Sequence, residues 1–440
     1  MDMKTSVESI SAVKKKLMVE IEADKVEKKV NEAYRALAKK AKIPGFRPGK
    51  IPRRILESYF GNQVQEDVTK DLVSETLPKA VEETNTYPLT MPVVENDLLK
   101  IGQDFKYSAT MEVKPEFTLP DYMGLEVEKE IIAVKDEDVK TQLEVIRKNQ
   151  GNLISLEEDR GVKEGDYALL EYEAFEGEKA LEGVKSDNFL LNVGSGEFHP
   201  EFEKALIGLK KGDSTEIDVN FDDKYFNPKL AGKTVRFKVN ITDLKSMELP
   251  ALDDDFARSL GPDFTDLKTL EEKIKEDMIK RETSRIDRDV KRRLLKKISD
   301  GVDFTLPESL VDLEIRQAFE SIKQNLARSG SNMEKAGLNE EKLKEDFKPA
   351  SEKRVKEMLI LGEIAKQDEL TIEETDLTEG FREMAESIGQ DPEAVRRYYE
   401  ANRLMESFKE RLLEEKTLNY LVKGAKVIEL EADKIEPEKE

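Results

Sequence analysis

The order of hydrophobic and polar positions gives the first part of the chain a mixed character. Residues 24–40 repeat apolar side chains every three or four positions, and a second helical pattern follows Pro52. Other stretches alternate apolar and polar side chains, as half-buried strands do: 14–21, 92–99 and 105–113. The pattern predicts an N-terminal α/β domain over residues 1–114.

The next stretch, residues 115–149, differs from what precedes it. It begins with extended, proline-containing sequence and continues into a helical pattern after Asp136. We interpret it as a linker that joins the N-terminal domain to a later helical domain.

Residues 150–245 are rich in strand-like sequence. One short helical pattern, at 201–207, interrupts apolar or alternating runs that are separated by glycines. These runs cover 167–175, 188–193, 214–221 and 234–244. Several short strands around one helix predict a compact antiparallel β domain.

From residue 246 to 440 the pattern is helical and highly charged. Narrow apolar stripes recur at helical spacing between Leu267 and Ile298, and again after Pro307. Long helices with narrow stripes predict an elongated all-α C-terminal domain with arms. Together the four stretches predict a multidomain α+β protein.

Composition excludes several classes of chemistry. The 440 residues carry a formal net charge of −22, with one histidine and no cysteine. Disulfides, thiolate metal sites and multi-histidine metal centres are therefore excluded, and no metal, cofactor or ATP site is expected. The N-terminus lacks the apolar core of a signal peptide, and no stretch is apolar enough to cross a membrane, so we expect a cytoplasmic protein without a membrane partner.

The charge is segregated along the chain. No acidic residue lies between Glu32 and Glu57, where eight basic side chains form what we call the basic island. Residues 1–60 sum to +7, and the remaining 380 residues therefore carry −29. At the centre of the island, two glycines and two prolines fix a tight turn around Phe46. An exposed aromatic among cations suits an anionic partner, whereas a stiff loop with Phe46 tucked into the core is the alternative.

This turn, read as GFRPGKIP from Gly45, resembles the ribosome-docking signature of the bacterial trigger factor family. The resemblance extends over nearly the whole chain and implies an ATP-independent chaperone with a ribosome-binding domain, an FKBP-like prolyl isomerase domain at 150–245 and a helical client-binding domain. The implied partners are the ribosome, through a ribosomal protein and ribosomal RNA at the exit tunnel, and nascent or unfolded polypeptides. The resemblance also implies a homodimer off the ribosome. The implied ribosome-binding residues are Gly45, Phe46, Arg47, Pro48, Gly49 and Lys50.

The middle domain resembles the FKBP family around Phe189 to Glu203 and at Gly208 to Asp213. Prolyl isomerisation needs an apolar cup that favours a twisted amide, and it needs no nucleophile, metal or cofactor. Carried over by position, the implied site is Tyr172, Leu181, Glu182, Phe198, His199, Phe202, Tyr225 and Phe237. The alternative is that these aromatic side chains are ordinary core.

Three positions depart from the FKBP pattern. His199 replaces an isoleucine, Glu201 replaces a glycine, and Leu181 replaces a phenylalanine. Glu201 adds a charge at the rim, so a weakened isomerase is one reading. In the ribosome motif Pro48 stands where the family has a cation, and Lys50 is the candidate to compensate. Two rival functions remain: a free folding isomerase or holdase without a ribosome role, and a helical scaffold protein.

Overall fold

The computed structural model describes residues 3–435 except 45, 47, 48, 157–159, 224, 226 and 228, and the side chain of Glu182. The chain forms two compact units. One combines Met1–Glu130 with Ile286–Glu440, and the other is Ile131–Arg285. Each unit is described by itself below.

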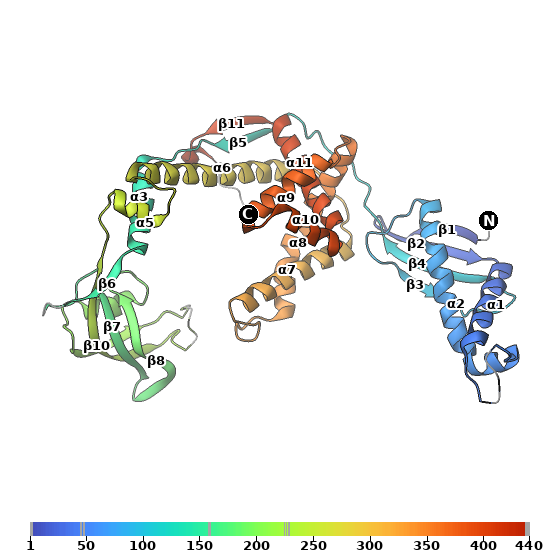
Figure 1. The fold of residues 1–440 in the computed structure, drawn as a ribbon, viewed down its shortest axis with the longest axis horizontal. Helices are drawn as coiled ribbons and strands as arrows, with labels where there is room; N and C mark the ends of the chain where they lie inside the picture. Colours follow the sequence, from blue (N-terminus) through green and yellow to red (C-terminus); the bar gives the residue numbers. More distant parts are fainter. Residues whose placement is uncertain are drawn as a thin grey trace. The chain divides into compact units, whose positions relative to one another are not determined.

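The N-terminal part of the first unit is a four-stranded antiparallel sheet whose one face is covered by helices (Figure 1). Strict alternation in β2 and β4 turns Leu17 and Tyr107 into the core, while their neighbours face solvent. The strand order is β1-β2-β4-β3. The elements are β1 (Met3–Ser9), β2 (Lys14–Ile21), β3 (Val93–Asn96), β4 (Phe105–Glu112), α1 (Ala23–Lys40) and α2 (Arg53–Thr84).

One strand of this part, β1, has no counterpart in the sequence pattern. Strand β1 pairs with β2 along its whole length, from Met3 opposite Ile21 to Ser9 opposite Lys15. Its side chains are mostly exposed because it is an edge strand, so it carries no clear apolar alternation. Helix α2 runs through Gly61 without a break, because the apolar face on both sides of that glycine packs against one core.

The C-terminal part of the first unit is built from helices. The second half of α6 contributes Val290 and Leu294 to a core shared with α8 and α11. The sequence pattern predicts a helix from about Ser351 to Gln367, whereas α8 begins at Glu340; the pattern misses its first two turns because they are exposed and carry no apolar stripe. The helices are α6 (Leu267–Asp300), α7 (Glu308–Arg328), α8 (Glu340–Gln367), α9 (Glu374–Ile388), α10 (Pro392–Ala401) and α11 (Met405–Gly424), followed by a short 3-10 helix, η1 (Ala432–Lys434).

A small parallel sheet joins two distant segments of the first unit. Strand β5 (Glu126–Glu130) pairs with β11 (Lys426–Leu430), and Val127 of β5 is buried against the helical core. The two strands lie side by side in Figure 1. The predicted linker therefore contributes a strand to this unit, whereas its helix, α3 (Asp136–Asn149), belongs to the second unit. The domain boundaries at 114, 149 and 245 stay predictions.

The second unit is dominated by a five-stranded antiparallel sheet. Its path is β6-β10-β7-β8, and β9 pairs with β10. A separate apolar cluster joins α3, α5 and the first half of α6 through Leu143, Phe256 and Leu270. The remaining elements are β6 (Asn152–Ser155), β7 (Tyr167–Glu176), β8 (Lys179–Asn192), β9 (Ser214–Asn220), β10 (Thr234–Glu248), α4 (Pro200–Leu206) and α5 (Asp254–Leu260).

Helices and antiparallel sheets thus combine as the sequence predicts, with a mixed N-terminal part, a β-rich middle and a helical remainder, which confirms the multidomain α+β fold. Among the described residues, no helix has the length and apolarity needed to cross a bilayer. The same residues contain no group of three or more acidic or histidine side chains placed to hold a metal ion.

Candidate functional site

The first candidate site is an aromatic cluster in the second unit, between the sheet and α4. Phe202 of α4 and Phe237 of β10 are fully buried, and their ring centroids lie 5.3 Å apart at nearly a right angle. Edge-to-face packing of this kind fixes both rings more firmly than apolar contact alone. These two rings form the floor of the cluster.

Two partly buried rings lie above that floor. The Phe198 centroid is 4.5 Å from Phe202 and 5.6 Å from Phe237, and the Tyr172 centroid is 5.9 Å from Phe237. Phe189 completes the group, at 5.4 Å from Tyr172 and 5.8 Å from Phe198. The predicted set did not include Phe189. Its signal was its place in the FKBP-like segment, in a strand that turns alternate side chains toward the sheet's covered face.

The other predicted residues lie at the edge of this cluster. Leu181 and Tyr225 are partly buried and pack against the same core. Tyr225 and His199 both contact Phe221, with centroids 4.6 Å and 5.2 Å away, and Phe221 in turn lies 6.2 Å from the floor ring Phe237. The side chain of Glu182 lies outside the described residues. The structure therefore brings the described members of the predicted set together, while their catalytic role stays a prediction.

The chemistry of this cluster is apolar. Burial raises the pKa of Tyr172 and of Tyr225, so both phenols stay neutral and keep their hydroxyl hydrogens at physiological pH. His199 is the N-cap of α4, and its Nδ1 accepts the backbone N–H of Glu201 at 3.3 Å. That nitrogen is thereby engaged in holding the helix, and Glu201 itself is exposed. Such an arrangement can bind an apolar group beside a peptide bond and exclude water from it.

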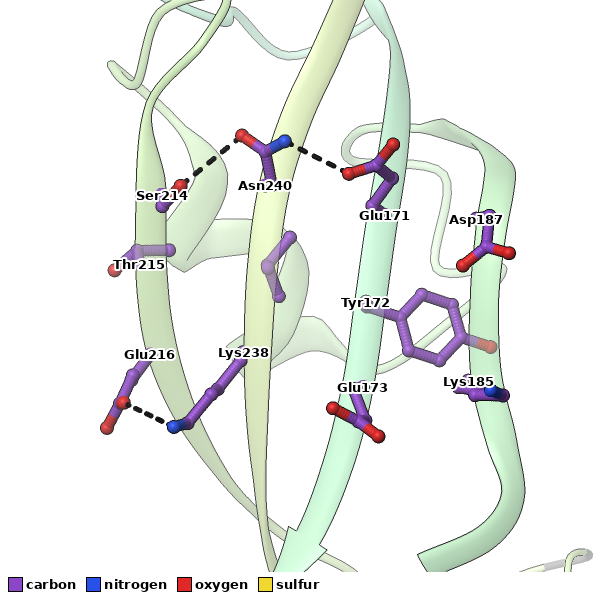
Figure 2. A pocket seen from close by; sticks show the side chains of 11 residues that line it. Glu171, Tyr172, Glu173, Lys185, Asp187, Ser214, Thr215, Glu216, Lys238 and Asn240 are labelled. Atoms are coloured by element: carbon purple, nitrogen blue, oxygen red, sulfur yellow. Dashed lines mark hydrogen bonds and ion pairs between the residues drawn. The ribbon is translucent and has the colours of Figure 1, made fainter. Parts of the chain in front are cut away.

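A cavity of about 580 Å³ lies elsewhere on the same sheet and differs in chemistry (Figure 2). The side chains of Glu171, Ser214 and Asn240 line it and are hydrogen-bonded across β7, β10 and β9. Lys238 pairs with Glu216 at 3.6 Å in the same lining. Tyr172 is the one predicted site residue among its lining residues. A polar, charged surface of this kind does not provide the water-free environment that a twisted amide needs.

The second candidate site is the turn between α1 and α2. Ile43 and Ile51, on either side of it, are buried, and the backbone N–H of Gly49 donates to the carbonyl of Ala38 at 2.8 Å. Gly49 has a φ of +83°, which glycine adopts without strain. Phe46 is 38% exposed, so the interpretation that it tucks into the core is wrong. Gly45, Arg47 and Pro48 lie outside the described residues.

The surface around this turn is basic and largely unneutralised. Arg53 is engaged, because it pairs with Glu57 at 2.7 Å and its guanidinium lies 5.1 Å from the ring centroid of Tyr34. Other exposed cations of the basic island form no ion pair with any acidic group in the described part of the chain. These six are Arg35, Lys39, Lys40, Lys42, Lys50 and Arg54.

The helical part of the first unit offers a third candidate surface. A groove of about 380 Å³ lies between α9 and α11, with Leu370, Ile372 and Leu412 among its lining. Gly380 lets the two helices approach closely, since a Cβ there would come within 2.7 Å of the Leu412 side chain. The groove joins apolar side chains with a charged margin that includes Glu383.

Comparisons with known proteins show which families this chain is similar to. Family models described as "Bacterial trigger factor protein (TF)" and its C-terminus match residues 3–146 and 266–423, and a model of FKBP-type peptidyl-prolyl cis-trans isomerase matches 158–242. A protein named trigger factor from Geotalea uraniireducens is 36% identical, over 98% of this chain and 100% of that protein. The trigger factor of Halalkalibacterium halodurans is 34% identical, over 94% and 96%. A solved structure titled for promiscuous substrate recognition by the trigger factor chaperone is 22% identical with a TM-score of 0.49, over 95% of this chain and 99% of that one.

Proposed function

Because this chain belongs to the bacterial trigger factor family, a family of chaperones with an FKBP-type domain, we propose that it acts without ATP on nascent chains at the ribosome. In this proposal it works in the cytoplasm, docks beside the exit tunnel and isomerises X-Pro peptide bonds of the chains it holds. The observation that carries the proposal is the basic island: an exposed Phe46 on a pinned turn among cations that have no acidic partner in the described structure.

Docking follows from the physical chemistry of that turn. Ribosomal RNA presents phosphates, and unpaired cations gain more from them than cations already neutralised by a neighbour. Phe46 adds one apolar anchor for a protein surface, as aromatic side chains do in other interfaces. We therefore assign RNA to the surrounding cations and a ribosomal protein to the tip, with Gly45, Phe46, Arg47, Pro48, Gly49 and Lys50 as the docking residues.

The test is co-sedimentation of the full-length protein with purified ribosomes. Phe46→Ala combined with Arg47→Ala is expected to abolish binding at moderate salt. The matched control is Leu98→Ala with Lys100→Ala, which removes one exposed apolar and one exposed basic side chain from another loop of the same domain. If the Phe46 variant binds as the control does, the docking assignment fails and a free folding isomerase or holdase explains the chain better.

The isomerase step rests on the aromatic cluster. Phe202 and Phe237 offer a rigid apolar floor, and burial keeps the phenols of Tyr172 and Tyr225 neutral beside it. Such a cup lowers the barrier of about 18–20 kcal/mol by favouring the twisted amide over the planar one. Refolding of a protein limited by a cis-proline measures this step. No acceleration by the full-length chain would leave the middle domain as a peptide binder.

Client holding and self-association complete the proposal. The groove between α9 and α11, together with exposed apolar side chains such as Tyr398 and Ile388, would contact unfolded segments. Off the ribosome, the +7 N-terminal segment and the −29 remainder favour pairing of two copies as a homodimer. Sedimentation velocity at low and high salt tests this, and a monomer at both salts would refute it.

A further inference from the structure

Glu203 is a buried carboxylate whose place the sequence did not reveal. It follows the floor residue Phe202 on α4, and only 2% of it is exposed. Its oxygens accept three backbone N–H groups: Oε2 from Gly194 at 2.8 Å and Gly196 at 3.1 Å, and Oε1 from Phe198 at 3.0 Å. One side chain therefore ties α4 to the segment that leads from β8 into the aromatic cluster.

The segment is shaped to meet this carboxylate. Gly194 and Gly196 have φ values of +92° and +77°, a backbone region that residues with a Cβ rarely adopt. These turns aim successive N–H groups at one point, which makes a site for an anion. No lysine or arginine among the described residues forms an ion pair with Glu203, so the three N–H donors are its stabilisation.

We propose that Glu203 is a positioning residue for prolyl isomerisation, which sets where the Phe198 ring lies over the floor of the cluster. This inference rests on the isomerase function proposed above. Phe198 is partly buried, and its ring centroid lies 4.5 Å from that of Phe202. Its backbone N–H donates to Glu203 of α4, and this hydrogen bond holds the ring against Phe202. Without the carboxylate, the loop loses its three anchors together, and the Phe198 ring leaves the position that narrows the cup.

The variants to compare are Glu203→Ala and Glu203→Gln in the full-length protein. Alanine removes both acceptor oxygens and with them all three hydrogen bonds, whereas glutamine keeps one oxygen and turns an NH₂ group toward the other N–H donors. The control is Glu173→Gln, the same chemical change at an exposed position of the same domain. The probe is a tetrapeptide with a Phe-Pro bond, whose cis/trans exchange and affinity are both measured by NMR at a temperature where circular dichroism shows every variant folded.

We expect kcat/KM per folded molecule to fall by roughly ten- to a hundredfold for alanine, as for other sub-ångström to ångström misplacements. Glutamine should lie between alanine and the native protein, and the control should equal the native protein. Amide hydrogen exchange at Gly194, Gly196 and Phe198 should accelerate in the same order. A purely structural role would lower the melting temperature without changing kcat/KM of the molecules that remain folded.

Two results would overturn the inference. One is an alanine variant whose amides at 194, 196 and 198 exchange faster while kcat/KM stays within twofold of the native value. The other is exchange that does not change at all. If the native protein itself does not isomerise the peptide, the proposed isomerase function fails separately. The positioning role of Glu203 is then tested by peptide affinity. A loss of affinity that grows from the glutamine to the alanine variant supports this role, and equal affinities refute it.

Discussion

The basic island makes a quantitative prediction about salt. Six exposed cations around the turn have no acidic partner in the described structure: Arg35, Lys39, Lys40, Lys42, Lys50 and Arg54. Each cation that contacts a phosphate releases counterions, which makes the slope of log affinity against log salt more negative by about 0.7–0.9. If all six contact RNA, the slope is about −4.2 to −5.4, so a fourfold rise in salt weakens binding roughly three hundred- to two thousandfold.

The perturbation is Arg35→Ala with Lys39→Ala, two positions one turn apart on α1. Removing two phosphate contacts should reduce the slope to about −3 to −4. Both side chains are exposed, so the fold should be unaffected. The assay is equilibrium binding of the full-length protein to purified ribosomes between about 0.1 and 0.4 M salt, with the protein labelled at an introduced cysteine far from the island.

The control removes the same kinds of charge elsewhere. Arg328→Ala with Lys335→Ala takes one exposed arginine and one exposed lysine from the helical part. A slope equal to the native value in both double variants would refute the reasoning, because the cations of α1 would then contribute no phosphate contact. A slope near zero in the native protein would refute it more broadly, since binding would then be mainly apolar.

Three further predictions concern the isomerase-like unit and the N-terminal fold. Phe198→Ala should reduce isomerisation with little loss of stability, whereas Phe202→Ala should cost about 3–5 kcal/mol in urea unfolding because that ring is fully buried. Gly161→Ala should destabilise the same unit by about 1–3 kcal/mol in the same measurement, because its Cβ would come within 2.4 Å of a backbone carbonyl oxygen in a facing turn. In the N-terminal part, the hydrogen bond from Lys29 lowers the pKa of Glu75 to about 2, so Lys29→Ala should raise that pKa in an NMR titration.

The first two of these predictions each have an outcome that contradicts them. Equal stability losses for Phe198→Ala and Phe202→Ala would remove the distinction between rim and floor. An unchanged unfolding midpoint for Gly161→Ala would contradict the second prediction, because the turn at Gly208 would then have moved to accommodate the added Cβ without loss of stability. The contribution of Glu75 is present at neutral pH and is lost as the pH falls from about 4.5 to 2, because its folded pKa is lowered. Because the Glu75 carboxylate is about a third exposed, its ion pair with Lys29 contributes less than about 1 kcal/mol to the stability of the fold.

Local patterns were reliable where one face of an element meets one core. The apolar stripe of 24–40 predicted α1 nearly to the residue, and the alternation of 14–21 predicted β2. Edge strands and exposed helical turns were missed because neither buries a continuous apolar face. Strand β1 and the first turns of α8 bury little, so nothing in their hydrophobic pattern distinguishes them from loop. Their structure depends on pairing with a neighbour or on helix propagation.

The candidate sites divide in the same way. Phe46 and its cations could be located from charge and turn residues alone, since these are local in sequence. The FKBP-like residues were located by resemblance, and Phe189 was left out because nothing local distinguishes a rim aromatic from a core one. Glu203 gave no signal, because a glutamate in a short charged helix ordinarily faces solvent.

The sequence by itself determined the kinds of element, the segregation of charge and the absence of thiol and multi-histidine chemistry, because each of these depends on composition or on near neighbours. The tertiary structure decided the pairing of β5 with β11, some three hundred residues apart, and the burial of Glu203 against three N–H groups. The strand pairing forms only after the chain has closed a loop of some three hundred residues, whereas Glu203 meets its donors, five to nine residues away, only once α4 packs onto the core of the second unit. Their energy comes from burial and from geometry, which no single stretch of sequence contains.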